Sequence, residues 1–438
     1  MRIYDIIEKK KKGEELTKEE INYLITGFCE QKIFDYQVAA LLMAIYFKGM
    51  SKQEISTLTM AMASSGDMID LSEIKGIKVD KHSSGGVGDK TTLIVAPLVA
   101  AAGIPVAKMS GRALGHSGGT IDKLEAIEGF NTAISREKFI ESVNKINIAI
   151  AGQTGNLVPA DKKLYALRDV TATVDSIPLI ASSIMSKKIA GGADAIVLDV
   201  KAGSGAFMKD AEKAKELAKV MVEIGESLNR KTVAVVSNMD QPLGYAVGNS
   251  LEVKEAIETL KGKGPKDLEE ICLVLGAYML KLSGRTEEIP ELKNSLKELL
   301  ANGKAFEKFR EMVVNQGGNV DLIDNPEKFK QAEFKIPVKA ENDGYITAIK
   351  TDLIGIASMQ LGAGRESKED KIEYDVGVIV ERKIGDKVSK GDVLAWMHAN
   401  DNQKAQTSEK IIIEAYTIEK NETVQIPLII DIIEAENS

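Results

Sequence analysis

Two glycine-rich segments, 80–92 and 108–125, concentrate the residue types that bind anions. Eight of the 35 residues from Gly85 to Gly119 are glycine, which lets backbone N–H groups approach a ligand closely. Hydroxyl and ammonium side chains fill the gaps and can complete the shell of a phosphate dianion. The candidates for these contacts are Lys81, Ser83, Thr92, Ser110 and Thr120. The pattern predicts a phosphate site and not a metal site.

His82 lies within the first segment, in the run Asp80-Lys81-His82 that follows a short apolar run at 77–79. Imidazole is the side chain that exchanges protons nearest neutral pH, and the chain has only three histidines. A lone histidine is more often structural than catalytic. Here the adjoining anion loop favours a catalytic role, and we expect His82 to face the ligand.

The sequence Gly88-Asp89-Lys90-Thr91 resembles the end of a nucleotide-binding P-loop. In that motif the lysine follows a glycine directly. Here Asp89 intervenes and brings a negative charge to the place where phosphates would lie. A nucleoside triphosphate site is therefore discounted.

Charged residues of the second segment allow several interpretations. Asp122 and Glu125 follow Thr120 at a predicted helix start, where carboxylates favour the helix dipole, so capping is preferred to catalysis. Arg112 and His116 stay open, with organisation of the loop as one role for either.

Short apolar runs alternate with helical patterns from about residue 76 onward, and each run ends at a polar loop. The runs lie at 77–79, 106–109, 195–200 and 233–236. This alternation predicts a mostly parallel sheet, and open α/β sheets bind ligands at the carboxyl ends of their strands. We expect a discontinuous α/β domain over 72–160 and 193–334, carrying the phosphate.

Helical patterns flank this alternation. The chain begins with two capping boxes, Thr17 with Glu20 and Ser51 with Glu54, each ahead of an apolar helical repeat. A helical pattern returns later in the chain. We predict one helical lobe built from residues 1–66 and 161–192, with the ligand in a cleft between this lobe and the α/β domain.

Near residue 335 the composition changes to strand-like segments. Residues 385–394 have the Gly-Asp and Lys-Gly turns seen in biotinyl and lipoyl carrier domains, but no lysine flanked by methionine stands at the expected hairpin. A structural α+β module over 335–438 is therefore favoured. The predicted fold class is α/β plus α, with this module at the C-terminus.

The composition, 44% apolar and 28% charged among 438 residues, is that of a globular protein. A net charge of −8 disfavours nucleic acid as a partner. An anionic substrate must then be attracted by local cations, which Lys81, Lys90, Lys108 and Arg112 supply. The sequence has no signal peptide pattern and no run of 18 apolar residues, which predicts a cytoplasmic protein that does not cross a membrane.

The second segment resembles the signature of thymidine and pyrimidine-nucleoside phosphorylases, and the similarity continues through 161–187 and 239–244. The resemblance implies reversible phosphorolysis, in which a pyrimidine nucleoside and inorganic phosphate give the free base and α-D-(deoxy)ribose 1-phosphate. It also implies a homodimer formed by the helical lobe, and no organic cofactor.

The same resemblance implies roles for individual residues. Phosphate would be held by Lys81, Ser83, Thr92, Lys108, Ser110 and Thr120. The pyrimidine edge would be bound by Arg168, Ser183 and Lys187, whose two cations would stabilise the departing base. His82 would donate a proton or a hydrogen bond to the base O2. Apolar walls for base or sugar, with the core as an equal alternative, are Leu114, Tyr165, Ile180 and Phe207.

Within the family, the stricter thymidine enzymes tend to have an apolar residue at position 108. Lys108 is similar to the broad bacterial enzymes, which predicts that uridine, thymidine and deoxyuridine are all accepted. A strict thymidine phosphorylase is the alternative. A phosphoribosyltransferase of the anthranilate type is a less favoured one, because it would need magnesium and no Asp-Glu pair stands out to hold it.

Position 90 departs from the relatives that bind potassium, which have a threonine there. The other groups of that potassium site would be Gly88, Leu243, Ala246 and Glu255. An ammonium at Lys90 would occupy the same place and pair with Glu255. In the alternative, Lys90 points to solvent and the ion still binds.

Overall fold

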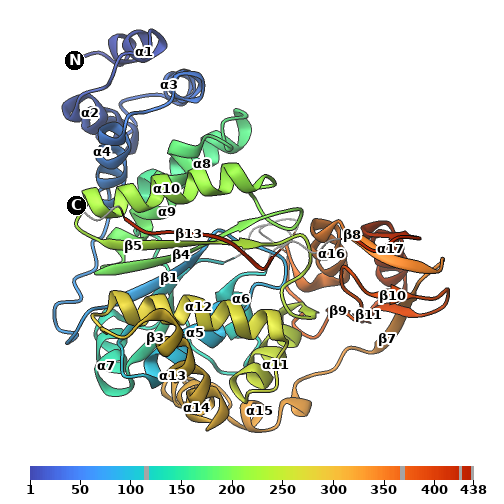
Figure 1. Ribbon diagram of the computed structural model, residues 1–438. Helices are drawn as coiled ribbons and strands as arrows, with labels where there is room; N and C mark the ends of the chain where they lie inside the picture. Colours follow the sequence, from blue (N-terminus) through green and yellow to red (C-terminus); the bar gives the residue numbers. More distant parts are fainter. Residues whose placement is uncertain (113–117, 366–369, 424–426, 436–438) are drawn as a thin grey trace.

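The computed structural model describes residues 1–438 apart from 113–117, 366–369, 424–426 and 436–438. Figure 1 shows a helical lobe at one end, a central sheet covered by helices on both faces, and a smaller module beside the sheet. The predicted fold class, α/β plus α with a C-terminal α+β module, is confirmed.

The helical lobe combines two segments that are far apart in the sequence. Both predicted capping boxes are present, at Thr17 with Glu20 and at Ser51 with Glu54. Helix α4 of the first segment packs on α9 of the second. The lobe consists of α1 (Ile3–Lys11), α2 (Lys18–Cys29), α3 (Asp35–Lys48), α4 (Lys52–Ala63), α8 (Pro159–Val170) and α9 (Ile177–Ala190).

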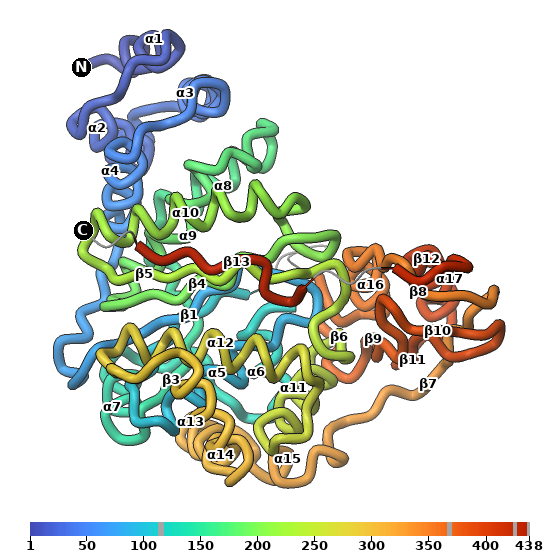
Figure 2. Tube along the Cα trace, in the orientation of Figure 1, coloured from blue at the N-terminus to red at the C-terminus, as the bar shows by residue number. Residues whose placement is uncertain are grey.

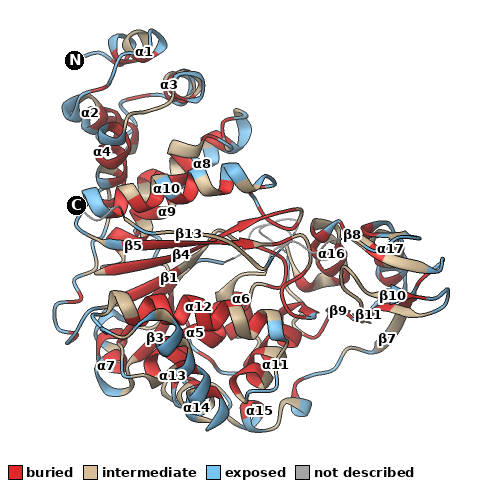
Figure 3. Ribbon diagram, in the orientation of Figure 1, coloured by how far each residue is buried: buried red, intermediate tan, exposed pale blue. Residues whose placement is uncertain are grey.

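The central sheet has the strand order β1-β4-β5-β13. Strands β1 (Val79–Ser83), β4 (Ala195–Ala202) and β5 (Lys231–Asn238) run parallel. All eight residues of β4 are buried, because helices cover both faces, and Figure 3 shows this burial along the middle of the sheet. A separate parallel pair joins β2 (Val106–Ser110) to β3 (Ile148–Gly152).

Helices enclose these strands. One face carries α10 (Ala211–Ser227), which also packs on α9 and α4 of the helical lobe. The other face carries α5 (Thr91–Ala101) and α12 (Lys266–Leu282). The remaining helices are α6 (Thr120–Glu125), α7 (Arg136–Ile146), α11 (Asn249–Leu260), α13 (Ile289–Ala301), α14 (Lys304–Asn315), α15 (Asp321–Asp324) and the 3-10 turn Pro326–Lys328.

The C-terminal module contains two antiparallel sheets, β6-β9-β11-β7 and β10-β8-β12. Two helices, α16 and α17, pack against each other beside them. The elements are β6 (Ala246–Val247), β7 (Phe334–Lys339), β8 (Gly344–Ile349), α16 (Thr351–Ser358), a π-helical turn Met359–Ala363, β9 (Gly377–Val380), β10 (Lys387–Val388), β11 (Val393–Ala399), α17 (Asn402–Ala415) and β12 (Tyr416–Glu419).

The module and the α/β domain exchange strands. Strand β6, from the α/β part of the sequence, pairs with β9. Conversely the chain leaves the module after β12, and β13 (Ile429–Ile433) pairs antiparallel with β5, as Figure 2 shows. The predicted extent of the module, 335–438, differs from the structure at this last strand, because an apolar strand can be satisfied at any free sheet edge.

Candidate functional site

The first glycine-rich segment connects the carboxyl end of β1 to the start of α5. Lys81 on β1 is buried, while His82 and Ser83 are half-buried at the strand's end. Gly85 and Gly88 have φ angles of 93° and 73°, a region that favours glycine. Thr92 lies in the first turn of α5. Strand, loop and helix start therefore have the arrangement that binds anions in α/β folds.

Lys90 turns inward from this loop. Its Nζ donates to the carbonyls of Leu243, at 2.8 Å, and Ala246, at 2.9 Å, and to Oε2 of Glu255, at 2.5 Å. The lysine is buried. Gly88 lies against the same loop, since a Cβ there would meet the Leu243 oxygen at 2.7 Å. The ammonium thus contacts three of the four groups that the family resemblance assigned to a potassium ion, those of Leu243, Ala246 and Glu255.

The second glycine-rich segment runs from the end of β2, whose last residue is Ser110, through α6, whose first residue is Thr120. Arg112 donates to both oxygens of Glu125, at 2.5 and 2.6 Å, and to Asp122 at 3.2 Å. These carboxylates are therefore ion-pair partners more than helix caps, and Arg112 has the organising role left open for it. Leu114 and His116 lie outside the described residues.

Asp80 links the α/β domain to the helical lobe through ion pairs. Its carboxylate accepts from Lys108 at 3.2 Å and from Lys188 of α9 at 2.8 Å. Both lysines are buried. Burial lowers the pKa of Lys108 to about 8, helped by the ammonium groups of Lys188 and Lys81 and opposed by Asp80. Sequence reasoning missed Asp80 and Lys188; the signal was a carboxylate inside an apolar strand pattern.

Lys81 belongs to a further buried network of alternating charges. Its ammonium donates to the hydroxyl of Thr91 and lies 3.6 Å from Asp199 and 3.9 Å from Asp89. Burial opposes ionisation of Asp89, yet the nearby cations, Lys81 foremost, hold its pKa well below the usual range. Asp89 also accepts from the Thr91 hydroxyl at 2.6 Å, so its charge is satisfied inside the loop.

The residues predicted for the pyrimidine lie on α8 and α9. Lys187 pairs with Asp161 at 2.6 Å and donates to the Ser183 hydroxyl at 3.1 Å. Arg168 is buried, and its guanidinium donates to three backbone carbonyls, those of Thr173 and Val174 in the connection after α8 and that of Leu179 in the first turn of α9. In this structure Arg168 therefore organises the α8–α9 connection.

The predicted apolar walls divide into two kinds. Ile180 is buried in the core that the helical lobe shares with the α/β domain, which favours its alternative role as a core residue. Tyr165 and Phe207 are 40% and 46% exposed, and Tyr165 lies under the Arg168 guanidinium at 5.8 Å. The two exposed rings keep the role of ligand wall as a prediction.

Burial and the cations of both the helical lobe and the α/β domain lower the pKa of His82. Burial lowers its pKa well below the usual value, and the cations Lys188, Lys108, Lys187 and Lys81 add to the effect. Two of these cations come from the helical lobe and two from the α/β domain. The imidazole is consequently neutral near pH 7.

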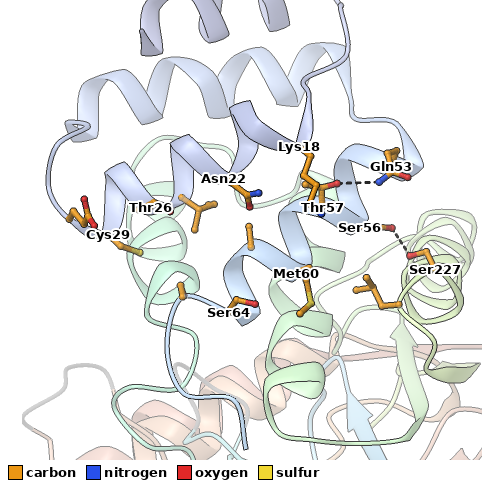
Figure 4. Close-up of a pocket in the computed structure, with 15 residues that line it drawn as sticks. Lys18, Asn22, Thr26, Cys29, Gln53, Ser56, Thr57, Met60, Ser64 and Ser227 are labelled. Atoms are coloured by element: carbon orange, nitrogen blue, oxygen red, sulfur yellow. Dashed lines mark hydrogen bonds between the residues drawn. The ribbon is translucent and has the colours of Figure 1, made fainter. Parts of the chain in front are cut away.

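A hollow of about 670 Å³ lies away from this site, between α2, α4 and the end of α10. Figure 4 shows that short polar side chains line it, with the Ser56 and Ser227 hydroxyls 2.6 Å apart. Among the described residues, those predicted for the site are not part of its lining. The hollow lies at the boundary between the helical lobe and α10.

Neither a metal cluster nor a membrane span is found in the described part of the chain. No three His, Cys, Asp or Glu side chains gather there as ligands. Outside the four gaps, no helix is both long and apolar enough to cross a membrane.

The comparisons first identify a general class, the glycosyl transferase family. Three family models match in succession, the glycosyl transferase family helical bundle domain over 4–66, its a/b domain over 75–306 and the pyrimidine nucleoside phosphorylase C-terminal domain over 345–419. Anthranilate phosphoribosyltransferase from Thermus thermophilus aligns with a TM-score of 0.58 at 21% identity, over 71% of this chain and 98% of that chain. This second likeness shows the fold alone.

Comparison with curated relatives identifies the particular family within this class. The pyrimidine-nucleoside phosphorylases of Geobacillus stearothermophilus and Bacillus subtilis are each 57% identical over 94% of this chain and 95% of their own. That of Staphylococcus aureus is 59% identical over 91% of this chain and 92% of its own. The chain belongs to the pyrimidine-nucleoside phosphorylase family, as its second glycine-rich segment indicated.

Proposed function

We propose that the chain catalyses the reversible phosphorolysis of pyrimidine nucleosides, with uridine, thymidine and deoxyuridine as substrates. The products are the free base and α-D-ribose 1-phosphate or its 2-deoxy form. The contact of Lys188 with Asp80 supports this most. It holds α9, which bears Lys187, against β1, which bears His82, so that a nucleoside and a phosphate can meet between them.

In the proposed reaction a phosphate oxygen bonds to C1′ while the bond from C1′ to the base nitrogen breaks. The bonding electron pair leaves with the base, and the configuration at C1′ inverts. Positive charge grows on the sugar and negative charge on the base. The phosphate dianion stabilises the positive charge on the sugar. Arg168 and Lys187 stabilise the negative charge on the base.

The proposed phosphate contacts lie on β1, on β2 and in the first turns of α5 and α6. Phosphate is bound by Lys81, Ser83, Thr92, Lys108, Ser110 and Thr120. His82, neutral by its low pKa, donates an N–H hydrogen bond to the base O2, and this bond strengthens as negative charge grows on that oxygen. Lys187 exchanges Asp161 for the pyrimidine when the lobes close, and such positioning supplies part of the about 7–11 kcal/mol available from proximity.

We further propose that the Lys90 ammonium replaces a monovalent cation. The three oxygens around Nζ support this. An ammonium forms directed hydrogen bonds to such oxygens and carries the charge that Glu255 requires. The enzyme would then need no added potassium.

We also propose that two copies associate through the helical lobe. Six exposed aromatic side chains lie within the first 48 residues of the chain, on or beside α1, α2 and α3; they are Tyr4, Tyr23, Phe34, Tyr36, Tyr46 and Phe47. Phe34 stacks on Tyr36 with ring centroids 5.7 Å apart. Exposed aromatic clusters of this kind are typical of interfaces.

One experiment tests the activity. The protein is incubated with phosphate and uridine, thymidine, cytidine or inosine, and release of base is followed by chromatography. We expect uracil and thymine with comparable kcat/KM, without added magnesium. Release from thymidine alone would indicate the strict thymidine enzyme, and no base from any pyrimidine nucleoside would overturn the proposal.

A further inference from the structure

The short helix α6 connects the phosphate loops to the C-terminal module. Thr120, its first residue, is a proposed phosphate contact. Asp122, two residues on, is only 1% exposed and accepts from Arg112 at 3.2 Å and from Arg365 at 2.9 Å. One of these guanidinium groups belongs to the second glycine-rich segment and the other to the C-terminal module. A single buried carboxylate therefore holds both.

The same helix also contacts the first glycine-rich segment. Lys123 is buried, and its Nζ donates to the carbonyl of Asp89 at 2.6 Å. The ammonium lies 2.7 Å from Glu252 of α11. Any displacement of α6 is consequently passed to both phosphate loops, to the first through Lys123 and to the second through Asp122.

Arg365 reaches Asp122 from a backbone that is itself anchored. The Ala363 carbonyl accepts from the Asn249 side chain at 2.8 Å, and the Tyr374 carbonyl accepts from the Ser250 N–H at 3.0 Å. The Arg365 side chain is 19% exposed. A preorganised, mostly buried guanidinium on a buried carboxylate makes a strong charge-assisted contact.

We infer that Arg365 is a positioning residue for phosphate, so that the C-terminal module sets the affinity for this substrate. The inference rests on the proposed phosphorolysis. Without Arg365, Asp122 loses its contact with the C-terminal module, and α6, which begins at Thr120, is held less firmly against that module. The proposed contacts to the pyrimidine edge, Arg168, Ser183 and Lys187, lie on α8 and α9, so the main effect falls on phosphate and not on the nucleoside.

The test separates the two substrates. For Arg365→Ala we expect the KM for phosphate to rise about tenfold, with the KM for uridine unchanged within a factor of about two. Arg365→Lys keeps a cation and should restore part of the affinity. Lys350→Ala is the matched control, because Lys350 pairs with Glu414 at the exposed surface of the same module.

A second readout does not depend on catalysis. Phosphate raises the melting temperature of any protein that binds it in the folded state, and this rise should be smaller for Arg365→Ala than for Lys350→Ala. Equal phosphate KM and equal melting shifts in the two variants would overturn the inference. A parallel rise of both KM values, without rescue by lysine, would also overturn it by showing a general structural role. A wild-type enzyme that binds phosphate but releases no base would instead refute the proposed function.

Discussion

At the scale of the residue, Lys90 gives the most specific prediction, because three oxygens surround its ammonium as they would surround a bound cation. We expect the wild-type enzyme to change less than about twofold between sodium and potassium buffers. Lys90→Thr removes the charge beside Glu255 and should lose about tenfold or more in kcat/KM in sodium. Added potassium should restore that loss. Steady-state rates at constant ionic strength measure both effects, with the exposed Lys263→Thr as control; strong potassium activation of the wild type would contradict the claim.

Protonation of Lys108 gives a second prediction at this scale. Its pKa of about 8 lies below the ordinary lysine value, so the ammonium is present below pH 8 and is lost above it. We expect the KM for phosphate to rise about tenfold from pH 7 to pH 9, since the charged fraction falls by about that factor. Lys108→Met should weaken phosphate binding at pH 7 and abolish this rise. His82, with its low pKa, should add no inflection between pH 6 and 8. A pH profile of the variant with the same basic limb would exclude Lys108 as its source.

At the scale of the element, most of the helices and strands could be predicted from local sequence patterns. Capping boxes, apolar periodicity and strand-ending loops each depend on residues within one turn or one strand, and the lobes, sheet and loops followed from them. Contacts between distant residues had no such signal. Lys188 meets Asp80 across 108 positions and Arg365 meets Asp122 across 243, and only the folded chain shows which buried charges pair.

Strand β13 is the element that local patterns placed least well, and its removal is testable. Ending the chain at Pro427 would expose the edge of β5 and uncover the apolar residues that β13 packs against both faces of the sheet. We expect a loss of about 3–6 kcal/mol in stability and a lower melting temperature by circular dichroism. Asp431→Ala keeps the strand and removes a 3.8 Å contact with Lys215 and the 2.8 Å hydrogen bond from the Ile432 N–H to its carboxylate, so it should melt close to the wild type. Equal melting of the truncated chain would show that β13 is dispensable.

At the scale of the whole molecule, we assign two tasks to the helical lobe, because the residues proposed to bind the pyrimidine lie on α8 and α9 and exposed aromatic rings lie on α3. Tyr36 and Phe47 are 70% and 75% exposed. Burying such rings between two copies would fix the helical lobes and leave the α/β domains to move, so closure of the cleft would not disturb the interface. We expect light scattering to give twice the chain mass of 47.4 kDa for the wild type, and a single mass for Tyr36→Glu combined with Phe47→Glu. Val314→Glu, on the exposed face of α14, should stay dimeric. A wild type that is monomeric at micromolar concentration would remove the interface, and activity of the double variant would then show whether each lobe works alone.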